Sequence, residues 1–435
     1  MLIILSLCDI VCQYVEKGGG FLKELLSKWK ELFTQPSFLA LFFIALIPLL
    51  PEYIAFVSVI IASAFAYKEL RREGRAVRLG AFGKLLVLFC AYQTLTCLIS
   101  SHPIHSLFVS LMWWFFLLGY LVLVNIIVNK RRMRHFLFMT TIVAGIVGIV
   151  AFIQYQINLA TGANTDSVWR WLDEIIYPLI KFGIVELPYG VRAYSTFSNP
   201  NLMAKYLVMV APFVAAYNFT EERKRFRIIA RIGLVFTYVG VIYSFSRGGY
   251  LAMILMGIAL VVIHFRKKLL SILLYTATTL LLLPNAVVDR LADINKVGER
   301  ELIWQHSIER IRQSPFWGYG AGTQPTYEFL HTMHIKAAHA HNVVLQLLLE
   351  GGMIALILMG AIGIKTIKDG FVLMLSKRKE AFWMGFGILG FAVMFLVHGM
   401  VDNPFSTPKL VVTFITLLGI VEQGYHLYAI RRKKE

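Results

Sequence analysis

Hydrophobic positions run along this chain in long blocks that short polar connections separate. Many blocks are long enough to cross a hydrocarbon core of roughly 30 Å, which takes about 20 residues. They lie near residues 81–100, 104–129, 135–160, 201–219, 228–245, 248–265, 268–285, 341–364, 381–401 and 408–430. The stretch from Ser37 to Tyr67 is interrupted by Pro48, Pro51 and Glu52, which predicts two short spans with a turn near Pro51. The pattern therefore predicts an all-α polytopic membrane protein with about twelve transmembrane helices.

The first 36 residues carry a weaker pattern. Met1 to Val15 is apolar but short and contains Asp9, and Phe21 to Phe33 alternates Lys with Leu, Trp and Phe. This amphipathic character predicts a pair of interfacial helices. A cleavable signal peptide is not expected, because no positive region precedes the apolar start and no small-residue cleavage site follows it.

Composition and charge support the membrane interpretation and set its orientation. Hydrophobic residues make up 58% of the chain and charged ones 16%, yet the net charge is +18. The basic residues form separate clusters at every second connection, so a nucleic acid partner is not expected. These clusters lie near residues 68–78, 130–134, 223–231, 266–268, 365–379 and 431–434. Because basic loops stay in the cytoplasm, we expect both termini inside.

The intervening connections then lie on the outer side of the membrane, and two of them are long. We expect an interfacial segment at 1–36, helices 1–9 within 37–285 with an outer loop at 161–200, a large and mostly helical outer loop at 286–340 between spans 9 and 10, and helices 10–12 with a basic tail at 341–435. All four cysteines lie in the N-terminal segment or within a span. Disulfides in the outer loops are therefore not expected.

The larger outer loop carries a helical pattern from Glu299 to Gln313, which Ser314 and Pro315 should end. Arg300 and Trp304 lie one turn apart on it. The following run of glycines, residues 318–322 (GYGAG), superficially resembles a dinucleotide-binding loop. That interpretation needs a preceding strand, so we expect a flexible turn here.

Four histidines gather before the tenth span: His331, His334, His339 and His341. Imidazole is a common zinc ligand, but the segment has no HExxH motif and no nearby cysteine. We favour metal-independent acid-base use of one histidine, against the plain alternative that His341 caps a helix and has no chemistry. At about 100° per residue, His341 and Gly352 should share one face of the tenth helix.

Three arginines, Arg192, Arg247 and Arg300, lie beside the predicted outer membrane boundary. A guanidinium at headgroup depth can hold a phosphate through two parallel hydrogen bonds. The alternative for each is snorkelling, or capping of carbonyls at a helix end. For Asn199 and Asn201 we favour a structural role at a helix start, with Asn199 as N-cap and Pro200 in the first helical position.

In combination these segments resemble the superfamily of O-antigen ligases and Wzy-type O-antigen polymerases, bacterial envelope glycosyltransferases. The resemblance rests on residues 195–207 (STFSNPNLMAKYL), 244–252 (SFSRGGYLA), 300–304 (RELIW), 314–320 (SPFWGYG) and 339–352, where His341 and Gly352 keep the family's spacing. It is dense in motifs from about residue 190 to 355 and only topological elsewhere.

The resemblance implies a GT-C-type fold that moves a glycan from undecaprenyl diphosphate to an acceptor hydroxyl, on the outer face of the bacterial inner membrane. It implies no nucleotide and no metal or other cofactor, and attack in line with the leaving group would invert the anomeric carbon. Arg247 and Arg300 would stabilise the departing diphosphate, and His341 would be the general base. Arg192, His339, Asn201 and Trp304 are expected to bind substrate, with His339 as the alternative base.

The acceptor decides between members of the superfamily, and the sequence leaves it open. A ligase takes lipid A-core and a polymerase takes another lipid-linked repeat unit. A protein O-glycosyltransferase takes a Ser or Thr, and we place it third. A flippase or other transporter shares the predicted topology but should carry ionisable residues near the midplane in two related halves. We expect buried positions to be mainly apolar instead.

Overall fold

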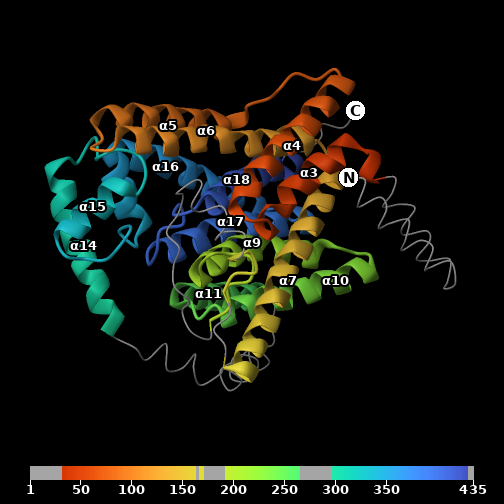
Figure 1. The fold of residues 1–435 in the computed structure, drawn as a ribbon. Helices are drawn as coiled ribbons and strands as arrows, with labels where there is room; N and C mark the ends of the chain where they lie inside the picture. Colours follow the sequence, from red (N-terminus) through yellow and green to blue (C-terminus); the bar gives the residue numbers. More distant parts are fainter. Residues whose placement is uncertain (1–31, 163–165, 171–191, 265–294, 430–435) are drawn as a thin grey trace.

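The computed structural model describes residues 32–162, 166–170, 192–264 and 295–429 (Figure 1). Within these ranges the regular structure is entirely helical. The helices are α3 (Pro36–Leu46), α4 (Glu52–Arg72), α5 (Gly80–Thr96), α6 (Pro103–Ile126), α7 (Lys130–Thr161), α9 (Pro200–Thr220), α10 (Lys224–Tyr243), α11 (Arg247–His264), α14 (Asn295–Gln313), α15 (Gln324–Thr332), α16 (Val343–Met374), α17 (Lys379–Gly399) and α18 (Pro408–Ala429).

Nine of the described helices are long and apolar enough to cross a membrane, namely α4 to α7, α9, α10 and α16 to α18. The segments Pro36–Leu49 and Arg247–Leu260 are shorter apolar helices. A polytopic helical membrane protein is therefore confirmed. The predicted span at 268–285 and most of the predicted interfacial segment at 1–36 lie outside the described residues. The turn expected near Pro51 is present, since the 3₁₀ helix Ile47–Leu49 follows α3 and α4 begins at Glu52.

Helix α9 forms the centre of the bundle, since 94% of the residues in its apolar stretch are buried inside the protein. It packs against α17, where a side-chain carbon at Gly390 would lie 2.6 Å from Pro212 of α9. Helices α7 and α10 approach even more closely, because Gly148 of α7 lies against the carbonyl of Phe236. Small residues thus let backbones meet where lipid-embedded helices gain their packing contacts.

The basic connections collect at one end of the bundle, which we call the basic end. Arg132, in the first turn of α7, pairs with Glu69 at 2.6 Å and Glu73 at 3.0 Å, both near the end of α4. Lys130 pairs with Glu380 in the first turn of α17. These contacts join the connections that the charge pattern places on one side, so alternate helices run in opposite directions.

The other end, which we call the His341 end, carries the described segment from α14 to the start of α16. Its helices α14 and α15 (teal, Figure 1) lie together beside α16. The predicted helix from Glu299 to Gln313 is confirmed within α14, and Ser314 follows its last residue. The starts of α9, α11, α16 and α18 and the end of α17 meet at this end. Residues distant in sequence are thereby brought together there.

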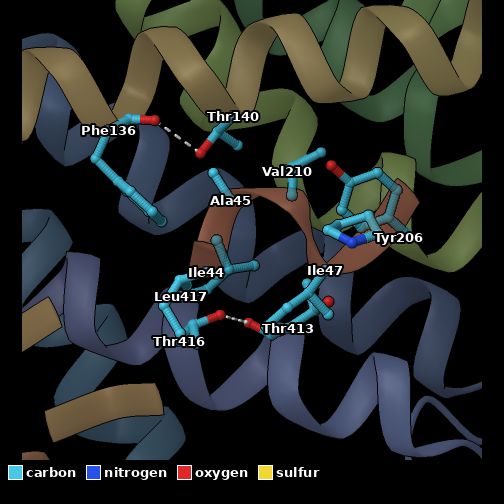
Figure 2. A pocket seen from close by; sticks show the side chains of 11 residues that line it. Ile44, Ala45, Ile47, Phe136, Thr140, Tyr206, Val210, Thr413, Thr416 and Leu417 are labelled. Atoms are coloured by element: carbon cyan, nitrogen blue, oxygen red, sulfur yellow. Dashed lines mark hydrogen bonds between the residues drawn. The ribbon is translucent and has the colours of Figure 1, made fainter. Parts of the chain in front are cut away.

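The pocket in Figure 2 lies between α3, α7, α9 and α18, inside the bundle. Two of its hydroxyls are taken up within their own helices, because Thr140 donates to the Phe136 carbonyl at 3.0 Å and Thr416 to that of Thr413 at 2.9 Å. Its walls are otherwise mostly aliphatic. The pocket therefore offers packing space but no acid-base chemistry.

Candidate active site

His341 is held in a rare backbone conformation at the start of α16. Its φ is 48°, in the left-handed region that non-glycine residues seldom adopt. The next residue, Asn342, is the N-cap of α16 and accepts from the backbone N–H groups of Val344 and Leu345 at 2.9 and 3.1 Å. The Asn342 amide also donates to the Met400 carbonyl at 3.1 Å, at the end of α17. The cap therefore fixes where the preceding histidine points.

Two side chains clamp Ala340, the residue between His339 and His341. The indole N–H of Trp304, on α14, donates to the Ala340 carbonyl at 3.0 Å, and the amide oxygen of Gln346 accepts from its N–H at 3.0 Å. The flanking histidine rings meet edge to face, with centroids 4.3 Å apart. The indole N–H of Trp304, a predicted substrate-binding residue, thus positions the loop that carries His339 and His341.

Asp402, in the connection between α17 and α18, is the buried partner of this loop. Its Oδ1 accepts from His341 Nδ1 at 3.0 Å and from the Asn403 N–H at 2.8 Å. Its Oδ2 lies 2.9 Å from the ammonium of Lys205, which is itself only 2% exposed. His339 Nε2 lies 3.6 Å from Oδ1, beyond a good hydrogen bond.

These contacts decide the charge of the carboxylate and the tautomer of the histidine. Burial alone would raise the pKa of Asp402, but the Lys205 ammonium and the His341 hydrogen bond together hold it well below its usual range. An ionised carboxylate only accepts hydrogen bonds, so His341 carries its proton on Nδ1. In the neutral ring, the nitrogen without a proton is therefore Nε2, and the side chain is 28% exposed.

His339 is suited to remain neutral beside this pair. Burial is the main cause that lowers the pKa of His339 to about 3. The neighbouring His341 ring and the cations Lys205 and Arg300 lower it further, while Asp402 acts in the opposite direction. The His339 ring therefore adds no charge at neutral pH. Among the described residues, His339, His341 and Asp402 form a group that could hold a metal ion, with ligand atoms within 4.8 Å of one another. A cation there would compete with the Lys205 ammonium for the same carboxylate.

Arg247 begins α11 directly after a tight turn in which Phe245 has a φ of 53°. The hydroxyl of Ser246 accepts from the Gly249 N–H at 3.3 Å, and its oxygen lies 3.4 Å from Nε2 of the buried His398. A side-chain carbon at Gly248 would lie 2.5 Å from Val401. The turn thus packs against His398 and Val401, so the start of α11 lies next to the connection that carries Asp402.

Arg300, on α14, is half-buried and lies one turn before Trp304. Its positive charge acts on both His339 and His398. Of the sequence-predicted residues, His339, His341, Arg300 and Trp304 are linked by these interactions, and Arg247 begins the helix after the neighbouring turn.

Arg192 and Asn201 support this site from behind. Arg192 is buried, and its Nε donates to the Ser244 carbonyl at 2.8 Å. Its Nη2 donates to the Asn201 side-chain oxygen at 2.6 Å. Asn201 lies one turn before Lys205 on α9. These contacts link the turn before Arg247 to α9, and they fit a positioning role. The predicted N-cap Asn199, with Pro200 as the first helical residue, is confirmed.

One expectation about α16 is wrong. His341 does not share a helix face with Gly352, because α16 begins after it at Val343 and breaks at Gly351 and Gly352. The 318–322 glycine segment, predicted as a flexible turn, is hydrogen-bonded to this break. The carbonyls of Leu349 and Glu350, next to the break, accept from the N–H groups of Tyr319 and Gly320 at 2.8 and 2.9 Å. Loop and broken helix thereby satisfy each other's backbone groups.

Four residues of the site were not predicted from the sequence: Lys205, Ser246, His398 and Asp402. Lys205 and His398 lie within predicted spans, where an ionisable side chain is unusual. That signal could have identified both of them. Buried positions are thus less uniformly apolar than expected, although Lys205 and the similarly buried Lys409 lie near the first turns of α9 and α18, at the His341 end.

Comparison with known families gives one match. Residues 232–360 match the family described as O-Antigen ligase. The resemblance inferred from the motifs is therefore confirmed in this region, which contains Arg247, Arg300, Trp304, His339 and His341. No curated protein matches the chain.

Proposed function

We propose that this chain, which carries an O-antigen ligase region at residues 232–360, transfers a glycan from a lipid diphosphate to an acceptor hydroxyl at its His341 end. The family supports a membrane glycosyltransferase of the ligase or polymerase type. The observation that carries the proposal is the hydrogen bond from His341 Nδ1 to the buried carboxylate of Asp402. It orients the ring so that Nε2 can serve as the base of the proposed transfer.

In the proposed reaction the acceptor oxygen attacks the anomeric carbon while His341 Nε2 takes the hydroxyl proton. A new carbon–oxygen bond forms, and the bond from the anomeric carbon to the diphosphate oxygen breaks. The electron pair leaves with the diphosphate, and the configuration at the carbon inverts. Asp402 stabilises the imidazolium that results, as a carboxylate does in a catalytic triad, and the proton then passes to water.

Arg247 and Arg300 would receive the negative charge that develops on the leaving diphosphate. Fixed cations aimed at such charge stabilise a transition state strongly where water is excluded. Two arginines can neutralise the diphosphate without a metal ion, so the proposed reaction uses no metal and no nucleotide. His339, uncharged at neutral pH, would line the acceptor side, while Trp304, Arg192 and Asn201 hold the site in shape.

The donor in this proposal is an undecaprenyl-diphosphate-linked glycan, and the acceptor is lipid A-core. The protein would lie in the bacterial inner membrane with its termini in the cytoplasm and the His341 end outside. A Wzy-type polymerase would use the same groups with a second lipid-linked repeat unit as acceptor. A protein O-glycosyltransferase would present a Ser or Thr, and a flippase would form no new bond.

The deciding experiment incubates purified protein with undecaprenyl-diphosphate oligosaccharide and each acceptor in turn, followed by mass spectrometry. Glycosylated lipid A-core supports the ligase, whereas a longer lipid-linked chain supports the polymerase. His341→Ala, and His341→Asn, which tolerates a positive φ better, should abolish product while donor binding persists. Full activity in both variants would remove the general-base role, and no product from the wild type with any acceptor would favour transport.

A further inference from the structure

A second hollow lies at the basic end, far from the His341 site. Its volume is about 240 Å³, and the residues that line it are Arg131, Arg134, His135 and Arg223. The first three lie in the first two turns of α7, and Arg223 is the N-cap residue of α10. The proposed glycosyl transfer uses none of these residues. About 24 Å of helix α9, at 1.5 Å per residue, separate Lys205 from this end.

Arg223 is fixed in place before any ligand binds. Its guanidinium donates twice to Glu221, at 2.8 Å from Nε and 3.0 Å from Nη2, and stacks 4.0 Å from the centre of the Phe226 ring. Burial alone would raise the pKa of Glu221, but these hydrogen bonds lower it to about 2, so the pair stays charged. Tyr217 holds the same carboxylate at 2.9 Å. The cation is thus presented on a rigid support.

The other two arginines differ from their neighbours on the same helical turns. Lys130 pairs with Glu380, and Arg132 pairs with Glu69 and Glu73. Arg131 and Arg134 make no ion pair with any acid in the described part of the chain, and with Arg223 their charges converge on the His135 ring. The like charges of Arg131 and Arg134 repel each other, and Arg223 adds a third cation that Glu221 only partly offsets. An anion between them would relieve that repulsion.

Basic residues at this end are expected from topology alone, but topology needs only that they lie in the connection. Here they line a cavity with no acidic side chain in its wall, at the membrane boundary, where phospholipid headgroups lie. Arginine forks match phosphate oxygens in pairs, and basic pockets between transmembrane helices bind anionic headgroups.

We infer that this hollow is a binding site for a phosphate-bearing anion, held by Arg131, Arg134 and Arg223. The phosphate can come from an anionic lipid headgroup or from a soluble phosphate compound. The site is separate from the proposed active site, so its test does not depend on the transfer reaction.

The test uses the full-length protein, purified in neutral detergent and stripped of lipid. Native mass spectrometry measures binding of phosphatidylglycerol and, as the uncharged-headgroup control, phosphatidylcholine. Calorimetry measures the binding of inorganic pyrophosphate to the same protein. The variant is Arg131→Gln with Arg134→Gln, and the matched control is Lys68→Gln with Lys377→Gln, which removes two exposed charges from the same end. Single Arg131→Gln, at an exposed position, serves if the double variant does not fold.

The wild type should prefer phosphatidylglycerol, and the Arg131/Arg134 variant should bind it at least about tenfold more weakly, while the lysine control is unchanged. If phosphatidylglycerol binds and pyrophosphate does not, the ligand is the lipid headgroup. If pyrophosphate displaces phosphatidylglycerol, the ligand is a soluble phosphate compound. Both outcomes support the site. Absence of binding to the wild type, an equal affinity in the arginine variant, or the same loss in the lysine control overturns it.

Discussion

Asp402 divides its two carboxylate oxygens between a proton carrier and a fixed cation. One oxygen accepts from His341, and the other lies 2.9 Å from Lys205. The lysine therefore orients the carboxylate, and the carboxylate orients the histidine. Asn at position 402 would keep the shape but lose the charge that stabilises the imidazolium.

We accordingly expect Asp402→Asn to lower kcat by about 10² to 10⁴-fold, with donor binding retained. Turnover and lipid-diphosphate binding measured on the same preparation check this. Asp166→Asn, which alters an acid bound to Arg170, is the control and should stay close to wild type. Equal turnover in Asp402→Asn would show that His341 does not need its partner's charge.

We expect Arg247 and Arg300 to act through paired hydrogen bonds to the donor phosphates as well as through their positive charge. Arg247→Lys and Arg300→Lys keep the charge but lose the paired hydrogen bonds, so each should lose about 10-fold in kcat/KM for the donor; the Gln variants should lose about 10²-fold or more. Steady-state kinetics with the lipid-linked donor measure both series. Arg312→Gln, exposed on the same helix as Arg300, should change little, and a comparable loss there would contradict the assignment.

His339 makes stability depend on pH. Its pKa falls from 6.5 to about 3 on folding, so the unfolded chain takes up a proton first as the pH drops. Its contribution to stability is therefore lost progressively below about pH 6.5 and falls no further below about pH 3. At pH 5 the loss is about 2 kcal/mol.

This predicts a lower thermal unfolding midpoint for the wild type at pH 5 than at pH 7, and a smaller pH dependence in His339→Gln. His331→Gln, at an exposed position, should behave like the wild type. If the unfolding midpoints of all three proteins depend on pH in the same way, the pKa of His339 is the same in the folded and unfolded states.

At this scale the sequence identified the residues whose own neighbourhood is distinctive, such as Arg247 in its glycine turn and His341 before a capped helix. It did not identify Asp402, because nothing near that residue indicates that the lysine it binds lies on α9 and the histidine in the loop before α16. Lys205 was visible as a cation in an apolar segment, but its partner was not.

At the scale of elements, the break in α16 is what joins the outer loop to the membrane helices. Gly352 has a φ of 59°, and a side-chain carbon there would lie 2.3 Å from the backbone of Phe316. Gly360, two turns later on the same helix, has open space around it. The two glycines form a matched pair of test positions.

Gly352→Ala should therefore destabilise the protein by more than about 2 kcal/mol and reduce transfer, because the loop can no longer reach the broken helix. Gly360→Ala should shift stability by no more than about 1 kcal/mol. Thermal unfolding in detergent compares the variants directly. Equal midpoints would mean that the contact between Phe316 and Gly352 is dispensable.

Local signals predicted the boundaries of many elements, including the Asn199 cap, the turn at Pro51 and the end of α14. They failed at α16, where a continuous apolar pattern conceals a break. A helix bends there because another segment supplies hydrogen bonds to its free carbonyls. Periodicity along one segment contains no information about that partner.

At the scale of the whole molecule, the proposed active site lies at the His341 end of the bundle and the basic connections lie at the basic end. In a protein whose four native cysteines are replaced by serine, Glu309→Cys on α14 should react with a membrane-impermeant maleimide in intact cells, whereas Lys377→Cys should react only after permeabilisation. Both positions are exposed, so accessibility is matched. The reverse labelling pattern would invert the proposed orientation.

The buried lysine of α9 also sets an order for assembly during synthesis. The Lys205 ammonium binds the Asn403 carbonyl as well as Asp402, and Asn403 lies 198 positions later in the chain. At roughly 5–20 residues per second, the ribosome needs about 10 to 40 s to make that interval. During this time α9 carries a cation without its final counterion. Lys205 therefore gains its partners only once the connection between α17 and α18 has been made, and chains that stop before it should be recognised as unfinished and degraded.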